Sequence, residues 1–125
     1  MSLVEFAILA FSSLLVIVDS DPRSNARAAE AVRIAAGVGT WKKAEVHLYL
    51  RGPAVLALTE FPDELLEEDN YTRYLPIVAE FGRPVRVQKG AMEGFDLGTP
   101  TQPFEEIDDA ELSRLAARST YVLRF

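Results

Sequence analysis

The chain has 125 residues, with 13 lysines and arginines against 19 aspartates and glutamates, a net charge of −6 and no cysteine. This length indicates one domain over residues 1–125, and the acidity argues against nucleic acid and anionic membranes, since both favour basic partners. Without cysteine the chain has no disulfide, zinc–thiolate site or thiol chemistry, and with His47 as its single histidine we expect neither a metal nor a cofactor.

The first apolar segment, residues 3–18, is shorter than the roughly 20 residues that a membrane-spanning helix needs. It also lacks the basic start and the small-residue cleavage site of a signal peptide. We therefore expect a cytoplasmic protein. The end of the segment, residues 14–19, is a continuous apolar run that closes on an aspartate. Such a run is typical of a parallel strand that is covered on both faces.

A helix is predicted over residues 23–38. Asp21 is a favourable N-cap and Pro22 suits the first helical position, while Gly37 and Gly39 are expected to end the helix. The predicted inward face consists mostly of small residues, which would let the helix approach a sheet closely: Ala28, Val32, Ala35 and Ala36.

The next segments alternate between apolar and polar character. Residues 44–50 are predicted as the second strand and residues 54–58 as a helical turn. The acidic residues 60–69 indicate a solvated loop with some helix. Residues 71–82 have the spacing of a helix that ends at a glycine, and Pro76 within it implies a kink or a late start.

The C-terminal third continues the alternation. Residues 84–88 are predicted as the third strand and residues 89–103 as a loop rich in glycine, threonine and proline. Asp108 and Glu111 form a capping box that starts a helix ending near Arg118. Residues 120–125 form the last strand. The order predicts an α/β three-layer sandwich, with a mainly parallel central sheet of about four to five strands and helices on both faces.

Seven polar or glycine residues follow the predicted strands, where open α/β sheets bind their ligands. They are Asp19, Asp21 and Arg23 after the first strand, Arg51 and Gly52 after the second, and Gln88 and Lys89 after the third. The basic side chains, with the amides of the following helix, could hold a small anion or nucleotide. Alternatively, they are ordinary surface charges beside buried strands.

Asp19 and Asp21 also form a D-x-D pattern, which in some phosphotransferases binds magnesium with the first aspartate as nucleophile. Lys89 is the one lysine placed to assist. Two departures weaken this interpretation, because Pro22 stands close to where such a phosphatase has threonine, and no strand ends in the phosphoacceptor aspartate of a receiver domain. The structural alternative is that Asp21 caps a helix and Asp19 is a polar strand end.

Two aromatic side chains lie outside this pattern. His47 is in the middle of the second strand, far from any strand end, and is predicted to be a hydrogen-bonded structural histidine rather than a catalytic one. Trp41 lies between the first helix and two lysines. It is either a contact for a partner or a cover for the helix end, and the sequence leaves both open.

The order and spacing of four stretches resemble the DsrE/DsrF-like family, which includes TusD-type sulfur-relay subunits. The stretches are residues 14–23 with the alanine-rich helix after them, residues 44–56, residues 84–87 and residues 121–125. The resemblance implies a small three-layer α/β sandwich that assembles as a dimer, trimer or hexamer. It also implies a working cysteine just after the third main strand, where this chain has Gln88, Lys89, Gly90, Ala91 and Met92.

Persulfide transfer requires a thiolate. The resemblance therefore implies the position of a site, the loop after Val87, but not the family's activity at that position. The sequence therefore predicts a non-catalytic DsrE-like domain that forms a homo-oligomer and binds a small anion or nucleotide beyond its strands, with no catalytic residue assigned. Two alternatives stay open. One is a magnesium-dependent phosphate-ester hydrolase or phosphotransferase that uses Asp19 and Asp21. The other is a subunit of a heteromeric sulfur-relay complex in which a related subunit supplies the cysteine.

Overall fold

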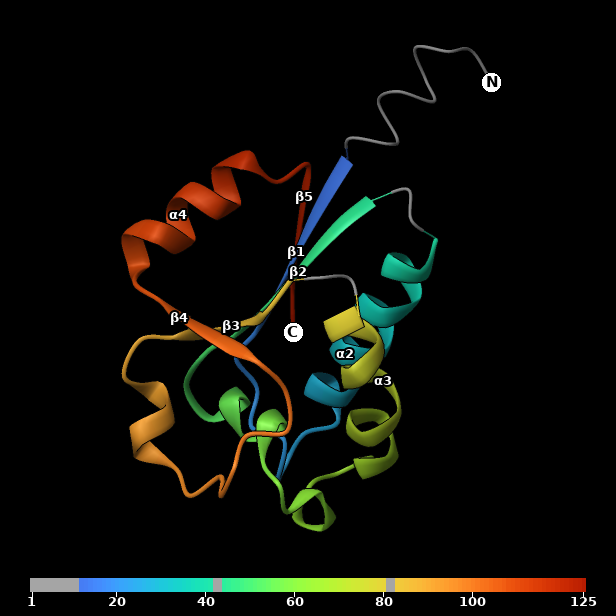
Figure 1. The fold of residues 1–125 in the computed structure, drawn as a ribbon, viewed down its shortest axis with the longest axis vertical. Helices are drawn as coiled ribbons and strands as arrows, with labels where there is room; N and C mark the ends of the chain where they lie inside the picture. Colours follow the sequence, from blue (N-terminus) through green and yellow to red (C-terminus); the bar gives the residue numbers. More distant parts are fainter. Residues whose placement is uncertain (1–11, 42–43, 81–82) are drawn as a thin grey trace.

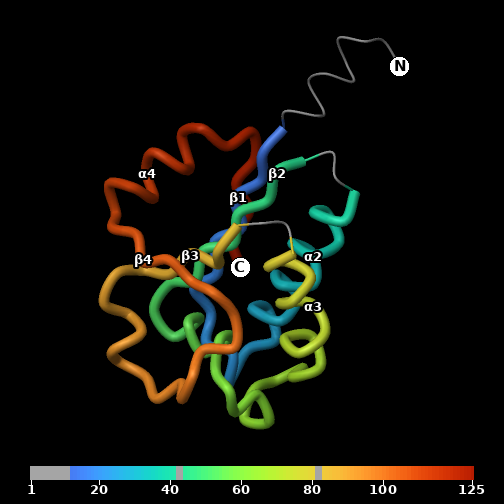
Figure 2. Tube along the Cα trace, viewed as in Figure 1, coloured from blue at the N-terminus to red at the C-terminus, as the bar shows by residue number. Residues whose placement is uncertain are grey.

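The computed structural model describes residues 12–41, 44–80 and 83–125, and it contains a five-stranded, fully parallel sheet in the order β4-β3-β2-β1-β5. The strands are β1 (Ser12–Val18), β2 (Ala44–Leu50), β3 (Val85–Gln88), β4 (Phe104–Ile107) and β5 (Tyr121–Arg124). The α-helices α2 (Arg27–Thr40) and α3 (Glu68–Glu80) lie side by side over one face of the sheet, and α4 (Asp109–Arg118) lies over the other (Figures 1 and 2). The predicted three-layer α/β sandwich is confirmed.

The two faces of the sheet are buried to different extents. β1 and β2 pair along seven residues, and their alternate side chains form a large core with α2 and α3. The opposite face has a smaller core under α4, made by Leu15, Tyr49, Ile107 and Leu115. The central strands are thus covered on both sides, which explains why residues 14–18 are apolar without alternation.

The predicted start of the first helix is wrong. α2 begins at Arg27, after Ala26, and Asp21 caps no helix. The Asp21 carboxylate instead accepts the Arg23 N–H at 2.9 Å, while the Asp21 carbonyl accepts N–H groups from a turn that follows. The chain therefore makes one turn, and a second at Asn25, whose side chain accepts the Arg27 N–H, before the helix begins.

The predicted end of α2 is also wrong, because the helix passes through Gly37 and Gly39 to Thr40. The Thr40 hydroxyl donates to the Ala36 carbonyl at 2.8 Å and satisfies a carbonyl of the last turn. The predicted inward face is confirmed, since Ala28, Val32, Ala35 and Ala36 are all buried. The small side chains let α2 lie close against β1 and β2.

The remaining elements follow the prediction with two differences. α3 starts at Glu68 and runs through Pro76, so the late start is wrong, and its predicted end at residues 81–82 lies outside the described residues. β4 was not predicted at all. Its sequence, Phe-Glu-Glu-Ile, is exposed except for Ile107, as an edge strand can be, and so resembles a polar loop.

Short 3₁₀ helices connect the main elements: η1 (Gly52–Leu58), η2 (Pro62–Glu64) and η3 (Ala91–Gly94). The first is the predicted helical turn after the second strand, and the third lies within the predicted loop after β3. The predicted N-cap of the last helix is confirmed, because the Asp108 side chain accepts the Glu111 N–H at 2.8 Å at the start of α4. Within the described ranges, no helix combines the length and the hydropathy that crossing a bilayer requires.

Candidate functional site

The carboxyl ends of β1, β2 and β3 meet at one edge of the sheet, as the sequence predicts, and two of the predicted residues bond directly. The Gly52 N–H donates to the Gln88 side-chain carbonyl at 3.0 Å. Arg51 extends toward the start of α4, with its Nη2 atom 4.0 Å from Asp109 Oδ1. The Lys89 side chain is exposed. The Arg51 N–H also donates to the Val18 carbonyl at 2.9 Å, so Arg51 joins the ends of β1 and β2, and Gln88 joins the ends of β2 and β3.

The two aspartates after β1 each have an arginine partner. Arg124 in β5 donates to Asp19 from Nη2 at 2.8 Å, and Arg23 donates to Asp21 at the same distance. The hydrogen bond from Arg23 holds the pKa of Asp21 below its ordinary value. A magnesium ion bound by both aspartates would compete with these two arginines for the carboxylates. Among the described residues, no group of three or more His, Asp or Glu side chains could hold a metal ion.

Gln88 begins the stretch, Gln88 to Met92, in which the resemblance places a thiol, and its side chain has a structural partner. Gly52 has a φ of +55°, a left-handed conformation that favours glycine and turns its N–H toward β3. The Gln88 amide oxygen accepts that N–H and so ties the two strand ends together. A sulfur carrier would need an accessible thiolate near this strand end. Here the end of β3 has a neutral amide whose oxygen is already hydrogen-bonded.

Replacing Gln88 with alanine is expected to lower the free energy of unfolding by about 1 kcal/mol, the usual net loss for one internal hydrogen bond. The matched control is Lys89→Ala, at an exposed neighbour, which should change stability by less than about 0.5 kcal/mol. Urea unfolding followed by circular dichroism measures both variants. Equal stability of Gln88→Ala and the unchanged protein would contradict the structural role of this bond.

A chain of polar contacts crosses β2 and β3 on the face that α4 covers. Arg83 pairs with Glu45 at 2.9 Å, Glu45 accepts from His47 Nε2 at 3.0 Å, and Arg86 contacts His47 Nδ1 at 2.9 Å. Arginine can only donate, so Nδ1 is the acceptor and Nε2 carries the proton. His47 is therefore neutral and hydrogen-bonded on both nitrogens, as a structural histidine is expected to be.

Burial, with the adjacent Arg86 charge, lowers the pKa of His47 below its usual 6.5. A lowered pKa means that the unfolded chain binds a proton first, so His47 favours the fold above pH 6.5 and loses this contribution as the pH falls through the folded-state pKa. We expect stability to decrease between pH 6.5 and 5, before most carboxylates titrate, and His47→Gln to flatten this decrease. Urea unfolding midpoints across that range provide the measurement, and parallel curves would contradict the assignment.

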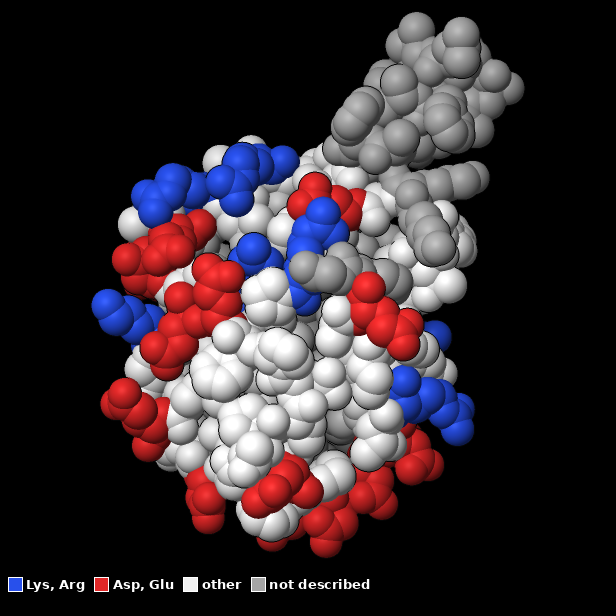
Figure 3. All heavy atoms as spheres, viewed as in Figure 1, with Lys and Arg blue, Asp and Glu red and all other residues white. Residues whose placement is uncertain are grey.

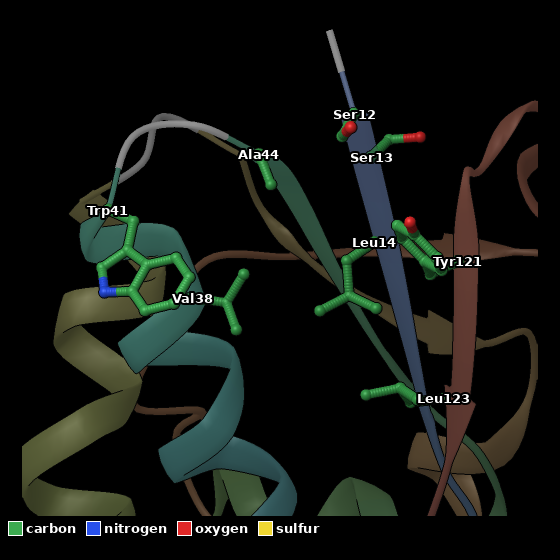
Figure 4. Close-up of a pocket in the computed structure, with 8 residues that line it drawn as sticks. All are labelled: Ser12, Ser13, Leu14, Val38, Trp41, Ala44, Tyr121 and Leu123. Atoms are coloured by element: carbon green, nitrogen blue, oxygen red, sulfur yellow. The ribbon is translucent and has the colours of Figure 1, made fainter. Parts of the chain in front are cut away.

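An apolar groove of about 600 Å³ lies at the other end of the sheet, between the start of β1, the end of α2 and β5 (Figure 4). It is lined by Ser12, Ser13, Leu14, Val38, Trp41, Ala44, Tyr121 and Leu123. The parallel register pairs Leu14 with Tyr121 and Val16 with Leu123, which turns both β5 side chains toward the α2 face. Among the described residues that line the groove, none is charged.

The apolar surface extends beyond the groove along the edge strand. Trp41 is 73% exposed and Tyr121 is 64% exposed, and Leu123 is exposed on the same side of the sheet. Val122 is exposed as well, but its register partner is Leu15, so it faces the α4 side of the edge strand. In the part of the chain that the structure describes, four of the seven exposed large apolar side chains lie here; the others are Phe61, Leu66 and Phe104. We name these four residues, Trp41, Tyr121, Val122 and Leu123, the edge patch. Of these four residues, the sequence indicates Trp41 alone as a candidate contact.

The all-parallel five-stranded sheet with helices on both faces is a DsrE-like fold, as the resemblance implies. Among solved structures, that of the YchN protein from E. coli superposes with a TM-score of 0.75 at 20% sequence identity, over 91% of this chain and 99% of that one. An identity this low establishes the fold alone. Neither protein-family models nor curated proteins give a match to the sequence.

Proposed function

We propose that this chain is a non-catalytic member of the DsrE-like class whose function is to assemble with copies of itself through the edge patch. The observation that carries the proposal is the concentration of exposed apolar side chains at β5 and the end of α2. Exposed apolar side chains that gather around one edge strand and its groove mark an interaction site, because leaving them in water is unfavourable.

The edge strand supports a second copy as the occupant. Within residues 12–41, 44–80 and 83–125, β5 pairs only with β1, so its outer backbone groups can accept another strand. In a two-fold arrangement the same patch meets itself. Because none of the described groove residues is charged, these residues bring no like charges together in such a contact, although the chain has a net charge of −6.

The proposal that the chain is non-catalytic rests on the residues at the carboxyl ends of the strands and on their bonding partners. The stretch from Gln88 to Met92 contains no thiol and Gln88 bonds to Gly52, while Asp19 and Asp21 each bind an arginine. Among the described residues, Lys89 has an exposed side chain with no ion pair. Of the charged side chains at the carboxyl ends of the strands, it is the one best placed to bind the predicted small anion.

Light scattering during size-exclusion chromatography tests the assembly directly. At high micromolar concentration we expect a mass of two, three or six chains. A monomer at these concentrations would overturn self-assembly. It would favour the alternative in which a related subunit that carries the cysteine covers the edge patch, and titration with such a subunit would then produce a complex.

A further inference from the structure

A second groove, distinct from the edge patch, lies between α4 and the strands β3 and β4. Its volume is about 180 Å³, below the roughly 300 Å³ at which drug-sized ligands begin to fit. Basic side chains gather over the C-terminal half of α4, with acidic ones below them (Figure 3). The polar side chains that line the groove are Arg86, Glu105, Glu111, Arg114 and Arg118.

The three arginines of this groove have no carboxylate partner. Within the described ranges, Arg86 hydrogen-bonds His47 but forms no ion pair, and the side chains of Arg114 and Arg118 make neither a hydrogen bond nor an ion pair. Six more acidic than basic residues are present in the chain, so carboxylates are abundant. Three unpaired guanidinium groups around one small groove leave many N–H donors for an added anion.

The Arg86 side chain is held in position by its hydrogen bond to His47, which is itself bonded to Glu45. His47 accepts from Arg86 at 2.9 Å, and Glu45 in turn accepts from His47 at 3.0 Å. Arg86 is therefore held at the groove before any ligand arrives, which lowers the entropy lost on binding. A guanidinium group donates two parallel hydrogen bonds to a phosphate, which makes arginine well suited to this anion.

Glu105 and Glu111 indicate which chemical groups the ligand has besides its phosphate. Neither carboxylate pairs with an arginine of the groove, although both line it. A carboxylate repels a phosphate but accepts hydrogen bonds from hydroxyl groups. The ligand that satisfies both kinds of side chain has a phosphate at one end and hydroxyl groups at the other, and the volume limits it to a few carbon atoms.

From this arrangement we propose that the groove between α4 and β3–β4 binds a small hydroxylated phosphomonoester, with its phosphate on Arg86, Arg114 and Arg118. Its hydroxyl groups bond to Glu105 and Glu111. The groove is on the face of the sheet opposite α2, so this site and the edge patch can be tested separately.

Isothermal titration with inorganic phosphate, glycerol 3-phosphate and glycerol tests the site. We expect both phosphates to bind with dissociation constants of about 1 mM or below, glycerol 3-phosphate more tightly, and glycerol not at all. The double variant Arg114→Gln/Arg118→Gln should weaken phosphate binding at least about tenfold, since hydrogen bonds to charged groups contribute about 1.5–3 kcal/mol. Both positions are exposed, so the variant should stay folded.

The matched control is Arg33→Gln on α2, because Arg33 pairs with Glu30 on the opposite side of the sheet. It should leave both affinities within about twofold. Glu105→Gln should reduce the preference for glycerol 3-phosphate over phosphate. No phosphate binding at about 10 mM, or equal weakening by Arg33→Gln, would overturn the proposal.

Discussion

Replacing Leu123 with arginine is expected to weaken self-association at least about a hundredfold and to leave a folded monomer. The substitution removes a large apolar side chain from the groove and puts an unpaired charge there, and together these cost several kcal/mol in a dry interface. Leu123 is 41% exposed in the chain, so the monomer does not depend on it for its core. Light scattering and sedimentation velocity measure the loss of assembly.

The matched control for this variant is Phe61→Arg. Phe61 has a similar exposed fraction, 46%, but lies beside η2, away from β5 and the edge patch. It should keep the assembly of the unchanged protein. Persistence of the full assembly in Leu123→Arg, or its loss in Phe61→Arg, would show that the contact surface lies elsewhere.

The second large effect is expected at the buried face of α2. Ala35 is fully buried against the sheet, and Ala35→Leu should lower the free energy of unfolding by about 1–3 kcal/mol, because close-packed cores resist added volume. The physical cause is the short distance between α2 and the central strands, which the small residues of this face allow. Urea unfolding at concentrations below those of assembly gives the value.

The control is Gly37→Ala, two residues along the same helix, which should raise the free energy of unfolding instead of lowering it. Gly37 is exposed, has no left-handed φ, and a Cβ atom built there meets nothing within 4 Å. Alanine should therefore stabilise the helix by about 0.5–1 kcal/mol. An Ala35→Leu variant as stable as Gly37→Ala would contradict the close packing of α2.

The fold was largely predictable because local patterns determine its elements. The second strand, at residues 44–50, has the predicted bounds, and Asp108 caps α4 as its spacing indicates. Where two local signals competed, the prediction failed. Asp21 and Pro22 suit a helix start, but Asp21 bonds to the adjacent Arg23 and a turn forms instead. β4 was missed because three of its four side chains face water.

The candidate sites were less predictable because they depend on strand order. Convergence of the strand ends follows from parallel pairing, so the approach of Gln88 to Gly52 could be anticipated. The pairing of Asp19 with Arg124 could not, because it requires β5 to lie beside β1. The same pairing creates the edge patch, by bringing Tyr121 to the groove that Trp41 lines from its other side.

Trp41 allows the most direct test of the central claim, that the edge patch is covered by another copy of the chain. It is the single tryptophan, it lines the groove, and it is 73% exposed in the isolated chain. Acrylamide quenching of its fluorescence should fall as the protein concentration rises, with the same midpoint as the increase in mass. Quenching that stays constant while the mass rises would contradict the claim, because the assembly would then leave the edge patch in water.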